Sequence, residues 1–211
     1  MSELPGRATA DDVASLVDSA VASLSTRLDR DWHVPAGSLD WTCWETVEHV
    51  SNSILYYAAQ MVPMASPATG PLPLDYQGRR PGGPDNALYA NPEAGTFGLL
   101  RVLNACGGIL ASLVRTTSPA TRAHHMWGRS DPEGFGAMGV VEVAVHVHDM
   151  SGALELEWAP AEDLCDRTLR RLFPDAPTDT ERWPTLLWAT GRTELPGHPQ
   201  LQDWRWYSQP H

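Results

Sequence analysis

The segment from about Gly136 to Ala153 constrains the fold most strongly, because almost every residue in it is apolar. A helix that is apolar on all sides has to be buried among other elements. This segment nevertheless carries Glu142 and His146, which are four residues apart and so lie about one turn apart on one face. Buried Glu and His side chains are costly unless they are paired or bind a metal. The sequence therefore predicts a central helix with a polar stripe inside the core.

The next two polar residues of this helix differ in direction. Asp149 is seven residues after Glu142 and returns to the same face, whereas His148 is six residues after it and points away. Asp149 is a candidate pocket residue that could orient a ligand histidine. Capping of the helix end is the equally open alternative.

A second helix is expected from Thr42 to about Met61, ending before Pro63. Thr42 and Glu45 have the T-x-x-E spacing of a capping box. Glu45 also lies four residues before His49 and could be a metal ligand, but capping is the preferred interpretation.

His49 lies among apolar residues of this second helix, and Asn52 and Tyr56 follow on its face as candidate pocket residues. Asn52 and Tyr56 could contact a substrate or simply pack in the core. If the two helices face each other, His49, Glu142 and His146 could bind one metal. Two His and one carboxylate suit Zn²⁺ with an open fourth position. Nickel, iron and manganese accept the same donors, and a purely structural Glu–His pair is the alternative.

The other periodic segments are also helical, and no long alternating strand pattern is present. The expected fold class is all-α, a four-helix bundle with long crossover loops over residues 8–155 and a short helical appendage packing on it over residues 156–211. Gly107 and Gly108 would weaken the third helix or mark close helix packing. The further helices are expected at 10–30, from about 93 or 96 to 115, at 160–173 and at 184–190, and a Pro- and Gly-rich loop is expected at 63–92.

Composition narrows the chemistry. The chain has 15 basic and 26 acidic residues, a net charge of −11, and every basic residue is arginine. Without lysine there is no Schiff base and no Walker-type lysine. The acidic charge argues against nucleic-acid binding.

Other features of the sequence bear on location and partners. Three widely spaced cysteines, no signal-peptide pattern and no apparent window of about 20 apolar residues predict a cytoplasmic protein that does not enter a membrane. The expected partner is a small-molecule substrate, and the protein is expected to be a monomer or a homodimer. Cys43 is expected to be a small buried residue rather than a reactive thiol.

Three segments together resemble a known family. Residues 41–50, WTCWETVEHV, resemble the W-T-x-x-(D/E)-x-x-x-H-(L/V) start of the second helix in the DinB-like superfamily, most closely in its mycothiol-dependent maleylpyruvate isomerase branch. Residues 142–150, EVAVHVHDM, resemble that branch's E-x-x-x-H-x-x-D-(L/M) helix. Residues 188–192, WATGR, resemble a W-x-x-G-R element of related actinobacterial proteins, and arginine-only basicity fits such a source.

The resemblance implies a DinB-like four-helix bundle with a divalent metal, usually zinc, held by His49, Glu142 and His146. It also implies a mycothiol-using S-transferase or isomerase that acts on a small molecule, with a metal-activated thiolate as the nucleophile. A protein nucleophile is not obvious in the sequence, which fits a thiol supplied from outside. The alternatives are a non-catalytic bundle that binds a small molecule or a structural metal, and a pocket recruited to another reaction in specialised metabolism.

Several loop and tail residues are weaker candidates. Arg122 and Arg129, like Arg79 and Arg80, could bind an acidic substrate or the thiol cofactor, although solvated arginines are the default interpretation. Exposure is likewise the default for His124 and His125, which otherwise could reach the site. Trp204 and Trp206 are expected to pack over the bundle, or to form one wall of the cleft.

Overall fold

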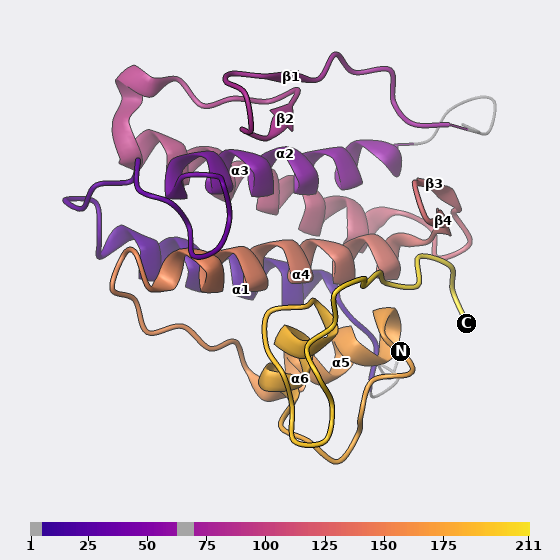
Figure 1. The fold of residues 1–211 in the computed structure, drawn as a ribbon. Coiled ribbons are helices and arrows are strands. Elements are labelled where there is room, and N and C mark those ends of the chain that lie inside the picture. The colour runs from indigo at the N-terminus through magenta and orange to yellow at the C-terminus, as the bar shows by residue number, and fades with distance from the viewer. Residues whose placement is uncertain (1–5, 63–69) are drawn as a thin grey trace.

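A computed structural model describes residues 6–62 and 70–211 (Figure 1). The described part is mostly helical, which confirms the all-α class. The boundaries agree with the sequence pattern to within a few residues at most helix ends, and the first helix ends five residues early. The α-helices are α1 (Ala10–Ser25), α2 (Cys43–Gln60), α3 (Gly95–Thr116), α4 (Pro132–Ser151), α5 (Glu162–Leu172) and α6 (Arg182–Ala189), and a 3₁₀ turn, η1 (Pro92–Ala94), precedes α3.

Helix α4 is the centre of the packing. Helices α3 and α4 each contact both α1 and α2, and they also contact one another. Sixteen of the twenty residues of α4 are buried, as its apolar sequence predicts. Asp131 caps its N-terminus by accepting a hydrogen bond from the Gly134 backbone N–H, and Pro132 occupies the first turn, where no amide donor is needed. The polar stripe of α4 therefore lies inside the core.

Helix α2 begins with the predicted capping box. Thr42 Oγ1 accepts a hydrogen bond from the Glu45 N–H at 3.2 Å, and the Glu45 carboxylate accepts one from the Thr42 N–H at 2.9 Å. The same carboxylate pairs with the Arg80 guanidinium at 2.7 Å. Glu45 thus caps the helix, and its two oxygens are engaged there rather than at a metal.

Two short hairpins lie in segments expected to be irregular. Strand β1 (Gln77–Gly78) pairs with β2 (Asp85–Asn86), and β3 (Ala123–His125) pairs with β4 (Gly128–Ser130), both antiparallel. Strands of two or three residues are too short to show an alternating pattern. Part of the expected long loop, residues 63–69, lies outside the described residues.

The C-terminal segment packs on α4 through α5, and α6 packs on α5 (Figure 1). The tail then returns along α5, where the Tyr207 N–H donates to the Leu172 carbonyl at 2.8 Å. Arg171 is buried and binds the Asp131 carboxylate at 2.8 Å and the Ser208 carbonyl at 3.1 Å. These contacts fix the tail against the start of α4. The division of the chain at residue 155 stays a prediction.

One apolar segment departs from expectation. Residues Pro92–Thr116 have a mean hydropathy of 1.7 in their most apolar window, so by length and composition this helix could cross a membrane. The expectation that no such window exists was wrong. The segment is strongly apolar because α3 contains only two charged residues, Arg101 and Arg115. Core helices of soluble proteins have the same property, and α3 contacts α1, α2 and α4. The hydropathy of this segment is therefore weak evidence for a membrane span.

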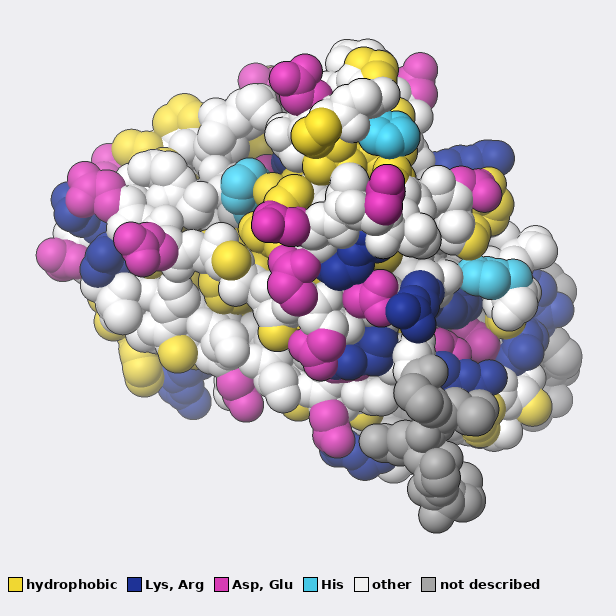
Figure 2. Space-filling model, turned by 90° about the horizontal axis from the view of Figure 1, so that it is seen from below, with side chains coloured by type: hydrophobic (Ala, Val, Ile, Leu, Met, Phe, Trp, Pro, Cys, Tyr) yellow, Lys and Arg dark blue, Asp and Glu magenta, His cyan; other side chains and the backbone are white. Residues whose placement is uncertain are grey.

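Charges are interspersed on the side of the molecule that carries α5 and α6. Figure 2, seen from below, shows acidic and arginine side chains mixed over this face. Arg167 pairs with Asp12 at 2.6 Å and with Asp163 at 2.9 Å, and Arg170 pairs with Asp166 at 2.7 Å. The arginines of α5 therefore do not form a separate basic surface.

The adjacent glycines of α3 provide a matched test of helix packing. A Cβ atom on Gly107 would lie 2.6 Å from Val17 Cγ1 of α1, whereas one on Gly108 would meet nothing within 4 Å. We expect Gly107→Ala to lower the free energy of unfolding by about 1–3 kcal/mol through overpacking. Gly108→Ala should raise it by about 0.5–1 kcal/mol, because alanine is the better helix former. Urea unfolding followed by circular dichroism measures both, and equal effects at the two positions would contradict this packing.

Candidate metal centre

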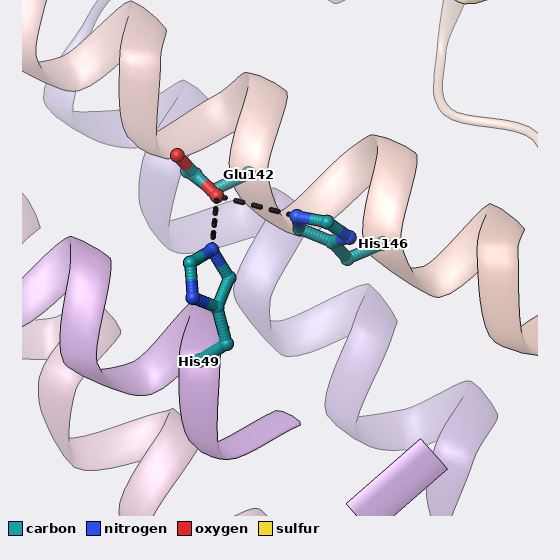
Figure 3. Close-up of side chains that lie close together, drawn as sticks. All are labelled: His49, Glu142 and His146. Carbon is teal, nitrogen blue, oxygen red and sulfur yellow. Dashed lines mark ion pairs between the residues drawn. The ribbon is translucent and has the colours of Figure 1, made fainter. Parts of the chain in front are cut away.

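The three residues expected to share a metal lie together between α2 and α4. His49 comes from α2, and Glu142 and His146 come from α4 (Figure 3). Glu142 Oε2 is 3.6 Å from His49 Nε2 and 3.5 Å from His146 Nε2. One donor atom from each residue lies within 4.8 Å of the other two, so the cluster could hold a metal ion.

The distances fit a divalent ion. Zinc ligands lie about 2.0–2.2 Å from the metal in a tetrahedron, which places neighbouring donor atoms about 3.4 Å apart. The two measured nitrogen–oxygen separations of 3.5 and 3.6 Å are close to that edge length. Imidazole and carboxylate donors also suit other transition metals, so the donors do not determine the identity of the metal.

Electrostatics make this cluster attractive to positive charge. Burial by itself would raise the pKa of Glu142, but hydrogen bonds with His146 and His49 outweigh burial and hold that pKa well below its usual range. Burial would lower the pKa of His146, but its hydrogen bonds with Asp149 and Glu142 raise it. An ionised carboxylate with two imidazoles favours either protons or a metal cation in this place, and metal binding would release the proton.

Asp149 orients the ring of His146. Its Oδ2 lies 2.9 Å from His146 Nδ1, which leaves Nε2 directed at Glu142. The Arg192 guanidinium donates two hydrogen bonds to the same carboxylate, from Nη2 to Oδ2 at 2.9 Å and from Nε to Oδ1 at 3.3 Å. Burial would raise the pKa of Asp149, but the hydrogen bonds from His146 and Arg192 outweigh it, so the pKa is lowered and Asp149 stays ionised. Of its two open roles, the orienting contact is the one observed.

Arg192 reaches the site through a glycine turn after α6. Gly191 has φ +72°, and a Cβ atom there would lie 2.8 Å from Trp204 Cδ1 and 2.9 Å from the Leu201 carbonyl. Only glycine fits such a turn without strain. This Gly-Arg pair belongs to the W-x-x-G-R resemblance at residues 188–192, which predicted no role for Arg192. The signal was a glycine followed by arginine at the end of a short helix.

Tyr57 holds the other oxygen of Glu142. Its hydroxyl donates to Glu142 Oε1 at 2.8 Å, which leaves Oε2 facing the two histidines. Burial and the nearby carboxylate raise the pKa of Tyr57 well above its usual value, so the phenol remains a donor. Tyr57 was not predicted as a site residue, whereas its neighbour Tyr56 was.

A cavity of about 720 Å³ adjoins the cluster, and all three candidate ligands line it. Tyr56 lines it as predicted. Asn52 also lines it, but its Oδ1 accepts hydrogen bonds from the backbone N–H groups of Ala87 and Leu88. The remaining lining residues are mostly apolar or aromatic: Ser53, Tyr57, Pro71, Leu72, Pro73, Leu74, Tyr76, Asp85, His125, Met126, Trp127, Val141, Val145, Arg192, Trp204 and Trp206.

The candidate arginines of the loops do not line this cavity. Arg122 donates to the Pro119 and Thr121 carbonyls, and Arg129 donates to the carbonyl of Arg122 itself. Their side chains are therefore bound within their own loop. Arg79 and Arg80 instead pair with Glu48 and Glu45.

The cysteines offer no nucleophile to the cavity. None of the three lines it, and all three are buried. Burial raises the pKa of Cys43 and of Cys106 to about 11, and that of Cys165 to about 12. The interpretation of Cys43 as a small buried residue agrees with these surroundings.

The expectation that His125 is an exposed loop residue was wrong. His125 lies in β3, is only 5% exposed and lines the cavity, because Trp127 and Trp206 pack around its ring. His124, on the other face of the strand, is half-buried. Trp204 and Trp206 also line the cavity, so the tail forms part of its wall.

The fold and the site define an all-α protein with a candidate metal centre between two of its long helices. No family model matches the chain, and no curated protein and no solved structure shows significant similarity to it.

Replacing Arg192 tests the positioning of His146. We expect Arg192→Met to weaken zinc binding by about 10- to 100-fold, because Asp149 would lose the partner that holds it against His146. Chelator competition measures the affinity, and circular dichroism verifies the fold. Arg182→Met is the matched control, because Arg182 is similarly buried in the same C-terminal segment, but its guanidinium binds Pro177, Thr180 and Asp166 and not Asp149. Equal zinc affinities in the two variants would contradict the positioning role.

His125 predicts a loss of stability in acid. Burial lowers its pKa to about 4, although the charge of Glu142 opposes this, so the folded protein resists protonation that the unfolded chain accepts below about pH 6.5. Protonation of this histidine in the unfolded chain should therefore lower the free energy of unfolding by up to about 3 kcal/mol as the pH falls from 6.5 to 4. Its Nδ1 accepts from the Trp127 N–H, a contact that His125→Asn can retain.

We expect His125→Asn to flatten the pH dependence of the unfolding free energy in this window, measured by denaturant titrations at pH 4–7. His33→Asn, which removes an exposed histidine, is the control. An unchanged slope in His125→Asn would show that His125 is not the group that resists protonation.

Proposed function

We propose that the protein is a metal-dependent enzyme that uses a low-molecular-weight thiol for S-transfer to, or isomerisation of, a small molecule. The observation that carries the proposal is the position of His49, Glu142 and His146, which form a three-donor cluster in the wall of a cavity of about 720 Å³. Three protein ligands are typical of catalytic zinc sites, which keep a fourth position open, whereas structural zinc sites have four.

The absence of a cysteine or lysine nucleophile from the described cavity lining supports an external thiol. No cysteine lines the cavity among the described residues, and the chain has no lysine. A divalent ion at this cluster would lower the pKa of a thiol in the fourth position and keep it as a thiolate at neutral pH. In S-transfer, a carbon–sulfur bond would form while the leaving group departs with its bonding electron pair, and the thiol proton would pass to solvent.

The chain's own residues would orient the cluster and exclude water. Tyr57 fixes one oxygen of Glu142, and Asp149 with Arg192 fixes the ring of His146. The ring of Trp41 packs against His49, with centroids 4.5 Å apart. Ligands held in this way lose little freedom when they bind a metal, which favours tight and correctly oriented binding.

The proposal includes membership in the DinB-like superfamily and mycothiol as the thiol. Both rest on the motif resemblance, and the adjacency of the two motif helices α2 and α4 supports them. A non-catalytic alternative is that the cluster is a structural ion-pair network, since Glu142 already has Tyr57 and both histidines as partners.

Metal analysis of protein purified without a histidine tag tests the proposal. We expect about one equivalent of a divalent metal per chain, as a single site requires. His49→Ala should bind that metal at least about tenfold more weakly, because it lacks one of three ligands. His33→Ala, an exposed histidine outside the cavity, is the control.

With the metal present, the protein should accelerate mycothiol consumption by an electrophile such as 1-chloro-2,4-dinitrobenzene, and His49→Ala should abolish the acceleration. Less than about half an equivalent of metal, together with unchanged activity and stability in His49→Ala, would overturn the metalloenzyme proposal. Metal binding without thiol consumption for any electrophile would favour a non-catalytic metal site.

A further inference from the structure

We propose that the cavity beside the metal cluster binds a neutral, largely apolar molecule with an aromatic body, and that it excludes carboxylates, sulfonates and phosphates. The inference extends the proposed function, because this molecule would be the electrophilic substrate. Its binding contacts, however, lie on aromatic and aliphatic side chains and do not require the metal. Three independent features of the cavity support this ligand class.

The first feature is an aromatic wall. Trp127 and Trp206 have ring centroids 5.0 Å apart, and Trp204 lies 5.8 Å from Trp206. His125 joins this group at 5.8 Å from Trp206, and all four rings line the cavity. Aromatic side chains bind flat rings by stacking and edge-to-face contact, with large apolar area. The hairpin β3–β4 and the C-terminal tail thus together present a surface suited to a ring system.

The second feature is an apolar rim. Leu74, Tyr76 and Met126 line the cavity and are 45%, 40% and 76% exposed. They come from two separate segments: Leu74 and Tyr76 lie in the loop before β1, and Met126 lies in the turn between β3 and β4. Three large apolar side chains gathered at one cavity and left in contact with water mark a binding surface. A ligand that covers them removes that surface from water.

The third feature is the charge balance. Among the described lining residues, Arg192 is the one Lys or Arg, and Asp149 already binds it through two contacts. Asp85 and Glu142 also line the cavity and carry carboxylates. Burial lowers the pKa of His125 to about 4, which disfavours its cationic form at neutral pH. Away from the cluster, an anionic group would therefore find no unpaired arginine among the described lining residues and would meet the Asp85 carboxylate, which is costly in a partly desolvated place.

The cavity volume agrees with such a ligand. About 720 Å³ lies within the range of pockets that enclose most of a drug-sized molecule. If the rings of the ligand pack against Trp127, Trp204 and Trp206, its reacting carbon could reach the part of the cavity wall formed by His49 and Glu142. The apolar contacts would then supply binding, and the cluster would supply the chemistry.

A matched pair of fluorescent probes tests the ligand class. N-phenyl-1-naphthylamine is neutral, and 8-anilino-1-naphthalenesulfonate has the same ring system with one sulfonate. We expect the purified protein to bind the neutral probe at one saturable site at least about tenfold more tightly than the sulfonate, as burial of an unpaired charge requires. Fluorescence titration measures both dissociation constants.

Rim variants locate the probe. Leu74→Asn and Met126→Asn each remove apolar surface from the rim, and because both side chains are largely exposed, the fold should be retained. We expect each to weaken binding of the neutral probe by about three- to tenfold. Phe97→Asn is the control, since Phe97 is 63% exposed on α3 and does not line the cavity.

Three results would overturn the inference: equal or tighter binding of the sulfonate, no binding of either probe, or equal binding of the neutral probe by the rim variants and the parent protein. The outcome is separable from that of the proposed function. Selective binding of the neutral probe by protein that lacks metal would uphold the ligand class and reject the metalloenzyme. Metal-dependent thiol consumption by protein that prefers the sulfonate probe would uphold the metalloenzyme and reject the ligand class.

Discussion

The burial of one carboxylate in an apolar helix determines much of the surrounding structure. Glu142 is 8% exposed in the middle of α4, where an ionised group without partners would strongly destabilise the fold. Tyr57 and the two histidines supply those partners from α2 and α4. The close packing of α2 against α4 therefore provides hydrogen-bond and ion-pair partners for the Glu142 carboxylate and also buries apolar surface. A divalent ion would satisfy it more completely, because it brings positive charge without the proton that His146 otherwise takes up.

The C-terminal segment completes the site as well as covering the bundle. Arg192 neutralises Asp149, which in turn holds His146, so a residue from the segment after α6 determines the orientation of a candidate ligand on α4. Trp204 and Trp206, a little further along, line the cavity. Ligand orientation and cavity shape both depend on this segment folding back onto α4 and α5. Loss of its packing would therefore impair metal affinity and small-molecule binding together, although none of its residues belongs to the three-donor cluster.

The sequence predicted the features that follow from local patterns. The apolar run of α4 required burial, the Thr42–Glu45 spacing required a cap, and helical spacing placed His146 beside Glu142. Tyr57 was missed because helical geometry places Tyr56 closer to the face of His49, whereas the lateral packing of α4 brings Tyr57 to Glu142. His125 was missed because its burial depends in part on Trp206, about 80 residues later in the chain. Such long-range contacts have no periodic signal in the sequence.

The contrast between the cluster and its cavity bears on how the site could work. Charge is concentrated at Glu142 and the two histidines, while the walls beyond them are mostly aromatic and aliphatic, with Asp85 and Arg192 as the charged exceptions. Apolar walls exclude water and lower the local dielectric, so each electrostatic interaction at the cluster is stronger than it would be in water. Such surroundings stabilise a thiolate only where a cation compensates its charge, and the lining arginine is already bound to Asp149. Thiolate chemistry in this cavity would therefore depend on the metal, because the one arginine among the described lining residues is already paired with a carboxylate.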